Sequence, residues 1–196
     1  ITEARIDESV KRILKDKFRL GLFDNPYVNK ENLSIIGNKD FMAKGRESQK
    51  RSLTLLKNEG NILPLKKGVK VYLQGFEMED LKKFGEVVDH PKEADFILLK
   101  LKTPFEPRSK YILERFFHQG RLDFPEEEKT ELLELIKTKP TITIFRMERP
   151  PVIPEINAAT AALIADFDSE NEVIIEMIFG EFKPTGHLPF EVPSSV

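Results

Sequence analysis

Apolar residues in the first part of the chain recur at the spacing of a helix. Ile6, Val10 and Phe18 belong to one apolar face over residues 3–20, and Gly21 is placed to end the helix in a left-handed conformation. The pattern predicts an amphipathic helix whose apolar face requires a partner.

Beyond residue 46 the pattern changes to short apolar runs that alternate with helical segments, which is typical of a sheet covered by helices. Because the apolar runs are continuous and contain β-branched residues, the strands should be buried on both faces and the sheet largely parallel. The sequence therefore predicts an α/β fold, a three-layer α/β/α sandwich. The predicted strands cover residues 69–75, 95–101, 141–145 and 161–165, and the predicted helices cover 77–85, a segment opened by Pro125, and 172–179.

Local signals support several of these elements. Pro125 suits the first turn of a helix because it has no N–H to leave unpaired, and Glu126 follows at the positive end of the helix dipole. Residues 58–61 predict a turn that joins two strands, and residues 183–186 predict another turn. Residues 149–151 are interpreted as a rigid loop rather than as a proline-rich recognition motif.

Length, composition and charge narrow the range of functions. The chain has 196 residues, which is enough for one core of ordinary size. Its 31 basic and 33 acidic residues give a formal net charge of −2, and the basic residues are scattered, so nucleic acid is not an expected partner. No apolar run approaches the roughly 20 residues that span a bilayer, so no membrane span is expected.

Neither cofactors nor metals are expected from the motifs. The chain has no glycine-rich phosphate-binding motif of either common type, which argues against nucleotide binding. It has no cysteine, so disulfides and cysteine-bound metals are excluded, while the cellular compartment stays open. His90, His118 and His187 lack the paired spacing of metal ligands.

Three segments together resemble one family of enzymes. Residues 46–65, RESQKRSLTLLKNEGNILPL, resemble the path from a helix into the first strand of the second domain of family 3 glycoside hydrolases. Residues 178–193, IFGEFKPTGHLPFEVP, resemble the end of that domain. Residues 3–27 are similar to the last helix and exit turn of the barrel that precedes this domain in the same enzymes. The three segments occur in the family's order.

The resemblance implies a division of the chain into three parts. Residues 1–23 correspond to the last helix of a barrel domain that lies upstream, residues 24–45 to a linker, and residues 46–196 to the C-terminal α/β sandwich domain. The apolar face of the first helix would pack on the barrel, and without a barrel it offers a contact for a dimer. The family's nucleophile is an aspartate of the barrel, so this chain alone is expected to be inactive.

The connection after the strand at 95–101 is the candidate site. Ligands meet an open parallel sheet at the carboxyl ends of its strands. Residues 103–124 are long for a connection between a strand and a helix, and long loops in compact domains tend to be functional. This loop carries aromatic residues, carboxylates, arginines and His118.

Two glutamates of this loop are candidates for acid/base catalysis. Glycoside hydrolysis with retention uses two carboxyl groups, a nucleophile and an acid/base, about 5 to 5.5 Å apart. The family is retaining, and in many of its β-glucosidases the acid/base is a glutamate of this loop within an E-G-x-D-R signature. This chain lacks the signature. The resemblance implies Glu106, followed by Pro107 and Arg108, as the candidate acid/base, with Glu114 as the alternative.

Other members of the family leave a second interpretation open. Those that act on N-acetylglucosaminides carry a histidine-based acid/base on the barrel, and in that case Glu106 is only the ion-pair partner of Arg108. Arg108 and His118 are the candidate substrate-binding residues, although a histidine beside two phenylalanines is more often structural. The chain therefore either completes the active-site wall of a retaining β-glycosidase, sharing a β-linked glycoside with the barrel, or is a non-catalytic module that stabilises the barrel or binds carbohydrate.

Overall fold

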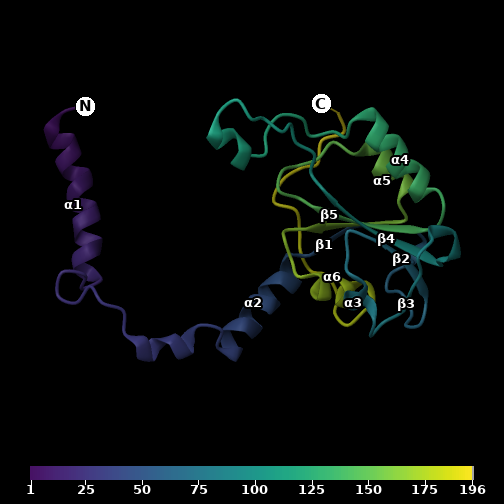
Figure 1. The fold of residues 1–196 in the computed structure, drawn as a ribbon, viewed down its shortest axis with the longest axis horizontal. Coiled ribbons are helices and arrows are strands. Elements are labelled where there is room, and N and C mark those ends of the chain that lie inside the picture. The colour runs from purple at the N-terminus through teal and green to yellow at the C-terminus, as the bar shows by residue number, and fades with distance from the viewer. Residues whose placement is uncertain (196) are drawn as a thin grey trace. The chain divides into compact units, whose positions relative to one another are not determined.

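The computed structural model describes residues 1–195, which form two compact units, Ile1–Met42 and the part that begins at Ala43. The second unit is a sheet with helices on both of its faces (Figure 1). Within the described residues the sheet has six strands in the order β1-β6-β5-β4-β2-β3. The strands are β1 (Thr54–Asn58), β2 (Lys70–Gln74), β3 (Glu86–Val87), β4 (Phe96–Lys102), β5 (Thr141–Arg146) and β6 (Ala162–Asp166).

The strand directions confirm a largely parallel sheet. β1 runs antiparallel to β6, and the other neighbouring pairs in the described sheet are parallel. The four predicted strands correspond to β2, β4, β5 and β6. β3 has no counterpart in the prediction, because a strand of two residues leaves no periodicity to detect.

Helices cover both faces of the sheet, which confirms the three-layer α/β/α sandwich. In Figure 1, α4 and α5 lie on one side of the sheet and α3 and α6 on the other. The helices from residue 39 onward are α2 (Lys39–Ser52), α3 (Met78–Leu81), α4 (Glu126–Ile136), α5 (Pro154–Ala159) and α6 (Asn171–Ile178).

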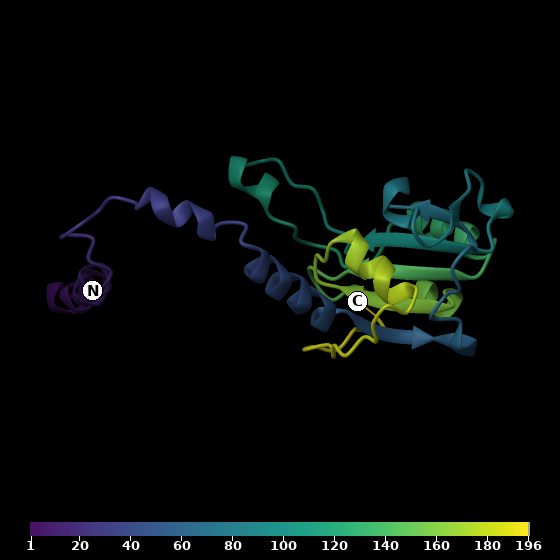
Figure 2. The same cartoon turned by 90° about the horizontal axis from the view of Figure 1, so that it is seen from below.

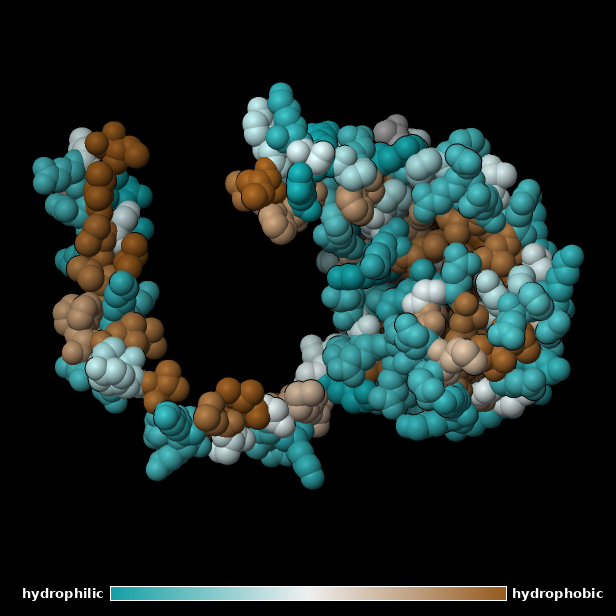
Figure 3. Space-filling model, in the orientation of Figure 1, coloured by the Kyte–Doolittle hydropathy of each residue, from teal (hydrophilic) through white to brown (hydrophobic). Residues whose placement is uncertain are grey.

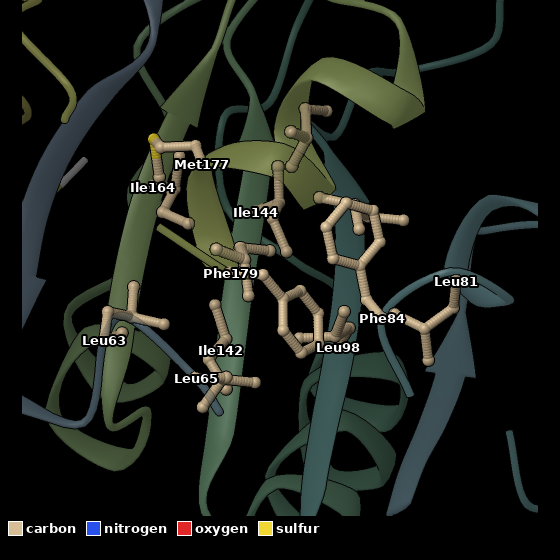
Figure 4. Packing of buried hydrophobic residues seen from close by; sticks show 14 of the residues in the cluster. Leu63, Leu65, Leu81, Phe84, Leu98, Ile142, Ile144, Ile164, Met177 and Phe179 are labelled. Carbon is tan, nitrogen blue, oxygen red and sulfur yellow. The ribbon is translucent and has the colours of Figure 1, made fainter. Parts of the chain in front are cut away.

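The central strands are buried on both faces. Ile97 and Leu99 of β4 pack in the cluster that includes α4 and α5, whereas Leu98 between them packs in the cluster that includes α3 and α6. This alternation explains why the strand has a continuous apolar sequence. On the α6 face, Phe84 and Phe179 stack with their ring centroids 5.0 Å apart above strand residues (Figure 4). Burial of such a side chain contributes about 1.5–3 kcal/mol relative to exposure.

The turn predicted at 58–61 lies between β1 and β2 along the chain, but these two strands are not neighbours in the sheet. A 3-10 turn, Glu59–Asn61, does follow β1. However, β1 pairs with β6, and the next strand along the chain, β2, lies on the other side of β4 in the sheet order. The Asn58 side chain hydrogen-bonds the N–H and the carbonyl of Leu63, and the chain then crosses to β2. Local turn chemistry does not specify which strands a turn connects.

α3 is shorter than the helix predicted over 77–85. Glu77 and Asp80 close its first turn, where the Glu77 N–H donates to the Asp80 carboxylate at 3.0 Å. Gly85 then passes so close to the main chain of Val69 that a Cβ would lie 2.6 Å from the Val69 carbonyl oxygen. This close approach places the residues after α3 against the sheet instead of in a helix.

The first unit contains α1 (Glu3–Arg19) and a 3-10 helix, Lys30–Ile35. α1 ends as predicted, with Gly21 at a φ of 67°. Its apolar residues form an exposed strip along the helix, and Phe18 is 65% exposed (Figure 3). The expected linker over 24–45 is not irregular throughout, because it includes the 3-10 helix and the first residues of α2. Among the residues described, no helix is both long enough and apolar enough to cross a membrane.

Candidate functional site

The candidate site lies on the loops that leave the carboxyl ends of the parallel strands. Residues 103–124, which we name the long loop, follow β4, and residues 147–153 connect β5 to α5. Because β4 and β5 are neighbours, the two connections leave the sheet side by side. The long loop extends beyond the end of the sheet (Figure 2).

The base of the long loop is held by hydrogen bonds. The Glu106 N–H donates to the carbonyl of Gln119 at 2.8 Å, which joins the outgoing and returning arms of the loop. The Thr103 hydroxyl donates to the carbonyl of Arg149 at 2.8 Å, which joins the loop to the β5–α5 connection. The base therefore has a defined main-chain geometry, although the outer part of the loop projects from the sandwich.

Arg149 binds the long loop with its side chain as well. Its guanidinium donates to the carbonyl oxygens of Pro104 at 2.5 Å, Arg121 at 3.1 Å and Gly120 at 3.2 Å. The planar guanidinium carries five N–H donors and can serve several carbonyls at once. The rigidity expected of residues 149–151 therefore rests on this side chain in addition to the two prolines.

Glu106 and Arg108 form an ion pair. Nη2 of Arg108 lies 3.0 Å from Oε2 of Glu106, and each side chain is about half exposed. The hydrogen bond from Arg108 holds the pKa of the Glu106 carboxyl below its usual value, and the positive charge of Arg121 acts in the same direction. Glu106 is therefore ionised near neutral pH in this chain.

Gly120 makes room for the Glu106 carboxyl group. Its φ of 75° lies in the left-handed region. A Cβ at this position would overlap the carboxyl carbon of Glu106. The carboxyl group of Glu106, the candidate acid/base, thus lies next to the main chain of Gly120, on the returning arm of the long loop.

His118 lies between an aromatic ring and a carboxylate. Its ring stacks on Phe105, with the ring centroids 3.9 Å apart and an angle of 18° between the planes. Its Nδ1 lies 2.6 Å from Oε2 of Glu148, a residue of the β5–α5 connection. The structure therefore places His118 at the base of the long loop, close in sequence to the Gln119 that pairs with Glu106.

Glu114 lies in a different part of the loop. It belongs to the 3-10 helix Ile112–Phe116, and its carboxylate accepts the Tyr111 N–H at 3.0 Å. Within residues 1–195 no hydrogen bond or ion pair links Glu114 to Glu106. This geometry gives Glu114 the role of capping the turn.

A second polar cluster lies at the same edge of the sheet. Lys100 donates to Asn171 at 2.8 Å, and Asn171 donates to Asp80 at 2.8 Å. The buried Asp166 carboxylate accepts the Ser169 N–H at 2.8 Å and lies 3.8 Å from Lys100. These contacts join α3 and α6 to the sheet.

Glu148 is not among the site residues that the sequence predicts. The available signal was its position directly after β5, at the carboxyl end of a parallel strand. Its pairing with His118 joins two connections that are 30 residues apart, which no local pattern indicates. In the described part of the chain, no group of three or more His, Asp or Glu side chains is arranged to hold a metal ion.

Two of the known proteins to which the chain is similar are named as beta-glucosidases. No family model matches the chain. Probable beta-glucosidase C of Aspergillus flavus is 43% identical over 201 residues, which cover 100% of this chain and 32% of that protein. A periplasmic beta-glucosidase/beta-xylosidase of Dickeya chrysanthemi is 36% identical over 201 residues, which cover 100% of this chain and 31% of that protein. The chain thus spans about a third of the length of the curated relatives it matches.

Solved structures share the fold. The beta-glucosidase from Listeria innocua, solved in complex with gluconolactone, matches with a TM-score of 0.73 and 23% identity over 99% of this chain and 32% of that one. The exo-1,3/1,4-beta-glucanase ExoP from a Pseudoalteromonas species matches with a TM-score of 0.71 and 22% identity over 95% of this chain and 30% of that one. At these identities the likeness establishes the fold alone.

Proposed function

We propose that this chain is the counterpart of the C-terminal domain of family 3 β-glucosidases, and that it completes the active-site wall of a retaining β-glycosidase. The whole protein then hydrolyses the O-glycosidic bond of a β-linked glycoside that binds between this domain and a barrel domain. The observation that carries the proposal is the Glu106 carboxylate, which is held at the base of the long loop and is about half exposed.

The proposal divides the chain as the family does. Residues 1–23 are the last helix of the barrel, residues 24–45 are the linker, and residues 46–196 are the second domain. The exposed apolar strip of α1 supports this assignment, because a helix with such a face needs a partner. The nucleophile is an aspartate of the barrel, so this chain supplies at most one of the two carboxyl groups.

Glu106 is the acid/base in this proposal, and Arg108 and His118 contact the glycoside. The ionised form, which the ion pair with Arg108 favours, is the form that acts as general base in the second half of a retaining reaction. The first half requires the protonated form. A bound glycoside removes water from the carboxyl group, which raises its pKa and opposes the effect of the guanidinium.

The test is Glu106→Ala in the full-length protein, assayed with two aryl β-glucosides that differ in leaving group. We expect kcat/KM for the poor leaving group to fall by about 100-fold or more, because that step needs a proton from the acid. The activated substrate should lose much less, and added azide should restore its turnover. Glu131→Ala, on the exposed side of α4, is the matched control and should behave as the wild type.

Two results would move the acid/base elsewhere. A selective loss on the poor leaving group in Glu114→Ala would assign the role to Glu114. Small and equal effects of Glu106→Ala on both substrates, without azide rescue, would support the second candidate function, a module that stabilises the barrel or binds carbohydrate. The ion pair of Glu106 with Arg108 favours this alternative, because it lowers the pKa of a group that must also carry a proton.

A further inference from the structure

His118 has neighbours on two sides although it is not part of the core. Phe105 covers one face of its ring, with 3.9 Å between the centroids, and the Glu148 carboxylate lies 2.6 Å from Nδ1. The side chains of His118 and Glu148 are 39% and 52% exposed. Within residues 1–195 no hydrogen bond to Nε2 of His118 is formed, so this nitrogen is available to a ligand.

The carboxylate of Glu148 decides where the neutral ring carries its proton. An ionised carboxylate only accepts hydrogen bonds, so a neutral imidazole at this distance carries its proton on Nδ1. An imidazole in water more often carries its proton on Nε2. The contact with Glu148 therefore converts Nε2 from a donor into an acceptor.

The main chain around Glu148 is fixed on both sides. The Met147 N–H donates to the carbonyl of Asp166 at 2.8 Å, which holds it to β6. The guanidinium of Arg149 binds three carbonyls at the base of the long loop. Glu148 thus approaches His118 from a segment whose position depends on both the sheet and the loop.

We propose that Glu148 is a positioning residue that holds His118 in the Nδ1–H tautomer, so that Nε2 accepts a hydrogen bond from a hydroxyl group of the glycoside. The inference rests on the proposed function for the identity of the ligand, but not for the tautomer. His118 stacks on Phe105, and Glu106 follows Phe105 in the chain. The acceptor nitrogen and the candidate acid/base therefore belong to the same part of the long loop.

The tautomer is measured on the 196-residue chain labelled with 15N in its histidine rings, at a pH where the rings are neutral. The exposed His90 and His187 serve as internal references. We expect His118 to carry its proton on Nδ1 in the wild type, to revert to the Nε2–H form in Glu148→Ala, and to keep the Nδ1–H form in Glu148→Gln, whose amide oxygen still accepts. A wild-type His118 in the Nε2–H form, or one unchanged in Glu148→Ala, overturns the inference.

The contact with substrate is measured on the full-length protein with nitrophenyl β-glucosides. Glu148→Ala should raise KM by about 10-fold through loss of one hydrogen bond, with little change in kcat, and Glu148→Gln should recover most of the wild-type KM. His118→Asn is the decisive variant, because its amide N–H can replace Nδ1–H toward Glu148 but nothing replaces Nε2. We expect His118→Asn to keep the raised KM. A wild-type KM in this variant would show that the pair only holds the loop, and it would overturn the inference.

Different measurements test the acid/base role of Glu106 and the positioning role of Glu148, so the failure of one proposal can be told from the failure of the other. The acid/base role of Glu106 is judged by the dependence on leaving group and by azide rescue. The role of Glu148 is judged by the ring tautomer and by a KM change of equal size for good and poor leaving groups. A selective loss on the poor leaving group in Glu148→Ala would contradict a positioning role in binding.

Discussion

At the scale of single residues, Gly120 leaves the space that the Glu106 carboxyl group occupies. It has a φ of 75°, and a side chain there would overlap the Glu106 carboxyl group. Gly68 has a similar φ of 87°, but no atom lies within 4 Å of the place where its Cβ would be. Substitution at the two glycines therefore causes the same kind of backbone strain, while a collision with a side chain occurs at Gly120 and not at Gly68.

We expect Gly120→Ala and Gly68→Ala to lower the free energy of unfolding by similar amounts, about 1–2 kcal/mol each, because alanine resists the left-handed conformation. The Glu106 side chain is flexible, so it should move aside in Gly120→Ala at little further cost. Only Gly120→Ala should then reduce hydrolysis of a glycoside with a poor leaving group by the full-length protein, by about 10-fold or more. Urea unfolding measures the loss of stability in both variants, and steady-state kinetics measure the loss of hydrolysis expected of Gly120→Ala. Equal activity of the two variants would argue against the placement of Glu106.

At the scale of elements, a charge network joins α2 to α6 and to the residue that precedes α6. Arg46 of α2 lies 2.7 Å from Glu176, 3.4 Å from Glu172 and 3.5 Å from Glu170. Lys50, one turn further along α2, lies 3.1 Å from Glu176. Burial alone would raise the pKa of Glu176, but the hydrogen bond from Arg46 and the ion pair with Lys50 more than offset this effect and hold the pKa below its usual value.

Glu176→Gln should lower the free energy of unfolding at neutral pH by about 1 kcal/mol, because it removes the charge at the centre of a partly buried network. A carboxyl group whose pKa is lower in the folded state contributes stability above its unfolded pKa and loses it as the pH falls through the folded value. The difference in Tm between wild type and variant should therefore be largest above about pH 5 and become smaller in more acidic solution.

The matched control for Glu176 is Glu181→Gln. Glu181 pairs with Lys67 at 2.7 Å, and both side chains are exposed, so a change of only a few tenths of a kcal/mol is expected, about 0.5 at most. Thermal unfolding from pH 3 to pH 7 measures both variants. A Tm difference for Glu176→Gln that does not depend on pH would contradict the assigned pKa direction.

At the scale of the whole molecule, the exposed strip of α1 predicts self-association of the 196-residue chain. Apolar side chains on this strip, such as Ile13 and Phe18, are largely exposed, and an apolar face of this kind favours a partner. We expect sedimentation velocity to detect dimers at micromolar concentration. Val10→Lys, on the strip, should shift the chain to monomer, whereas Glu8→Lys, on the other side of the helix, should not. A monomeric wild-type chain would contradict this prediction.

The sequence by itself determined the fold class and indicated where to look for a site. Burial of a strand on both faces requires consecutive apolar residues, so β4, β5 and β6 could be located from their apolar runs. The carboxyl end of β4 and the length of the loop after it pointed to residues 103–124. The amphipathic pattern of residues 3–20 and the role of Gly21 are equally local, and both were correct.

Only the tertiary structure decided which distant residues meet. β1 lies beside β6 rather than beside β2, Glu148 reaches His118 across 30 residues, and Arg149 binds the carbonyls of the long loop. Each of these contacts depends on the order of the strands and on the path of a long connection. Helical and strand periodicity report which face of a segment is buried, but they carry no information about the segment that covers it.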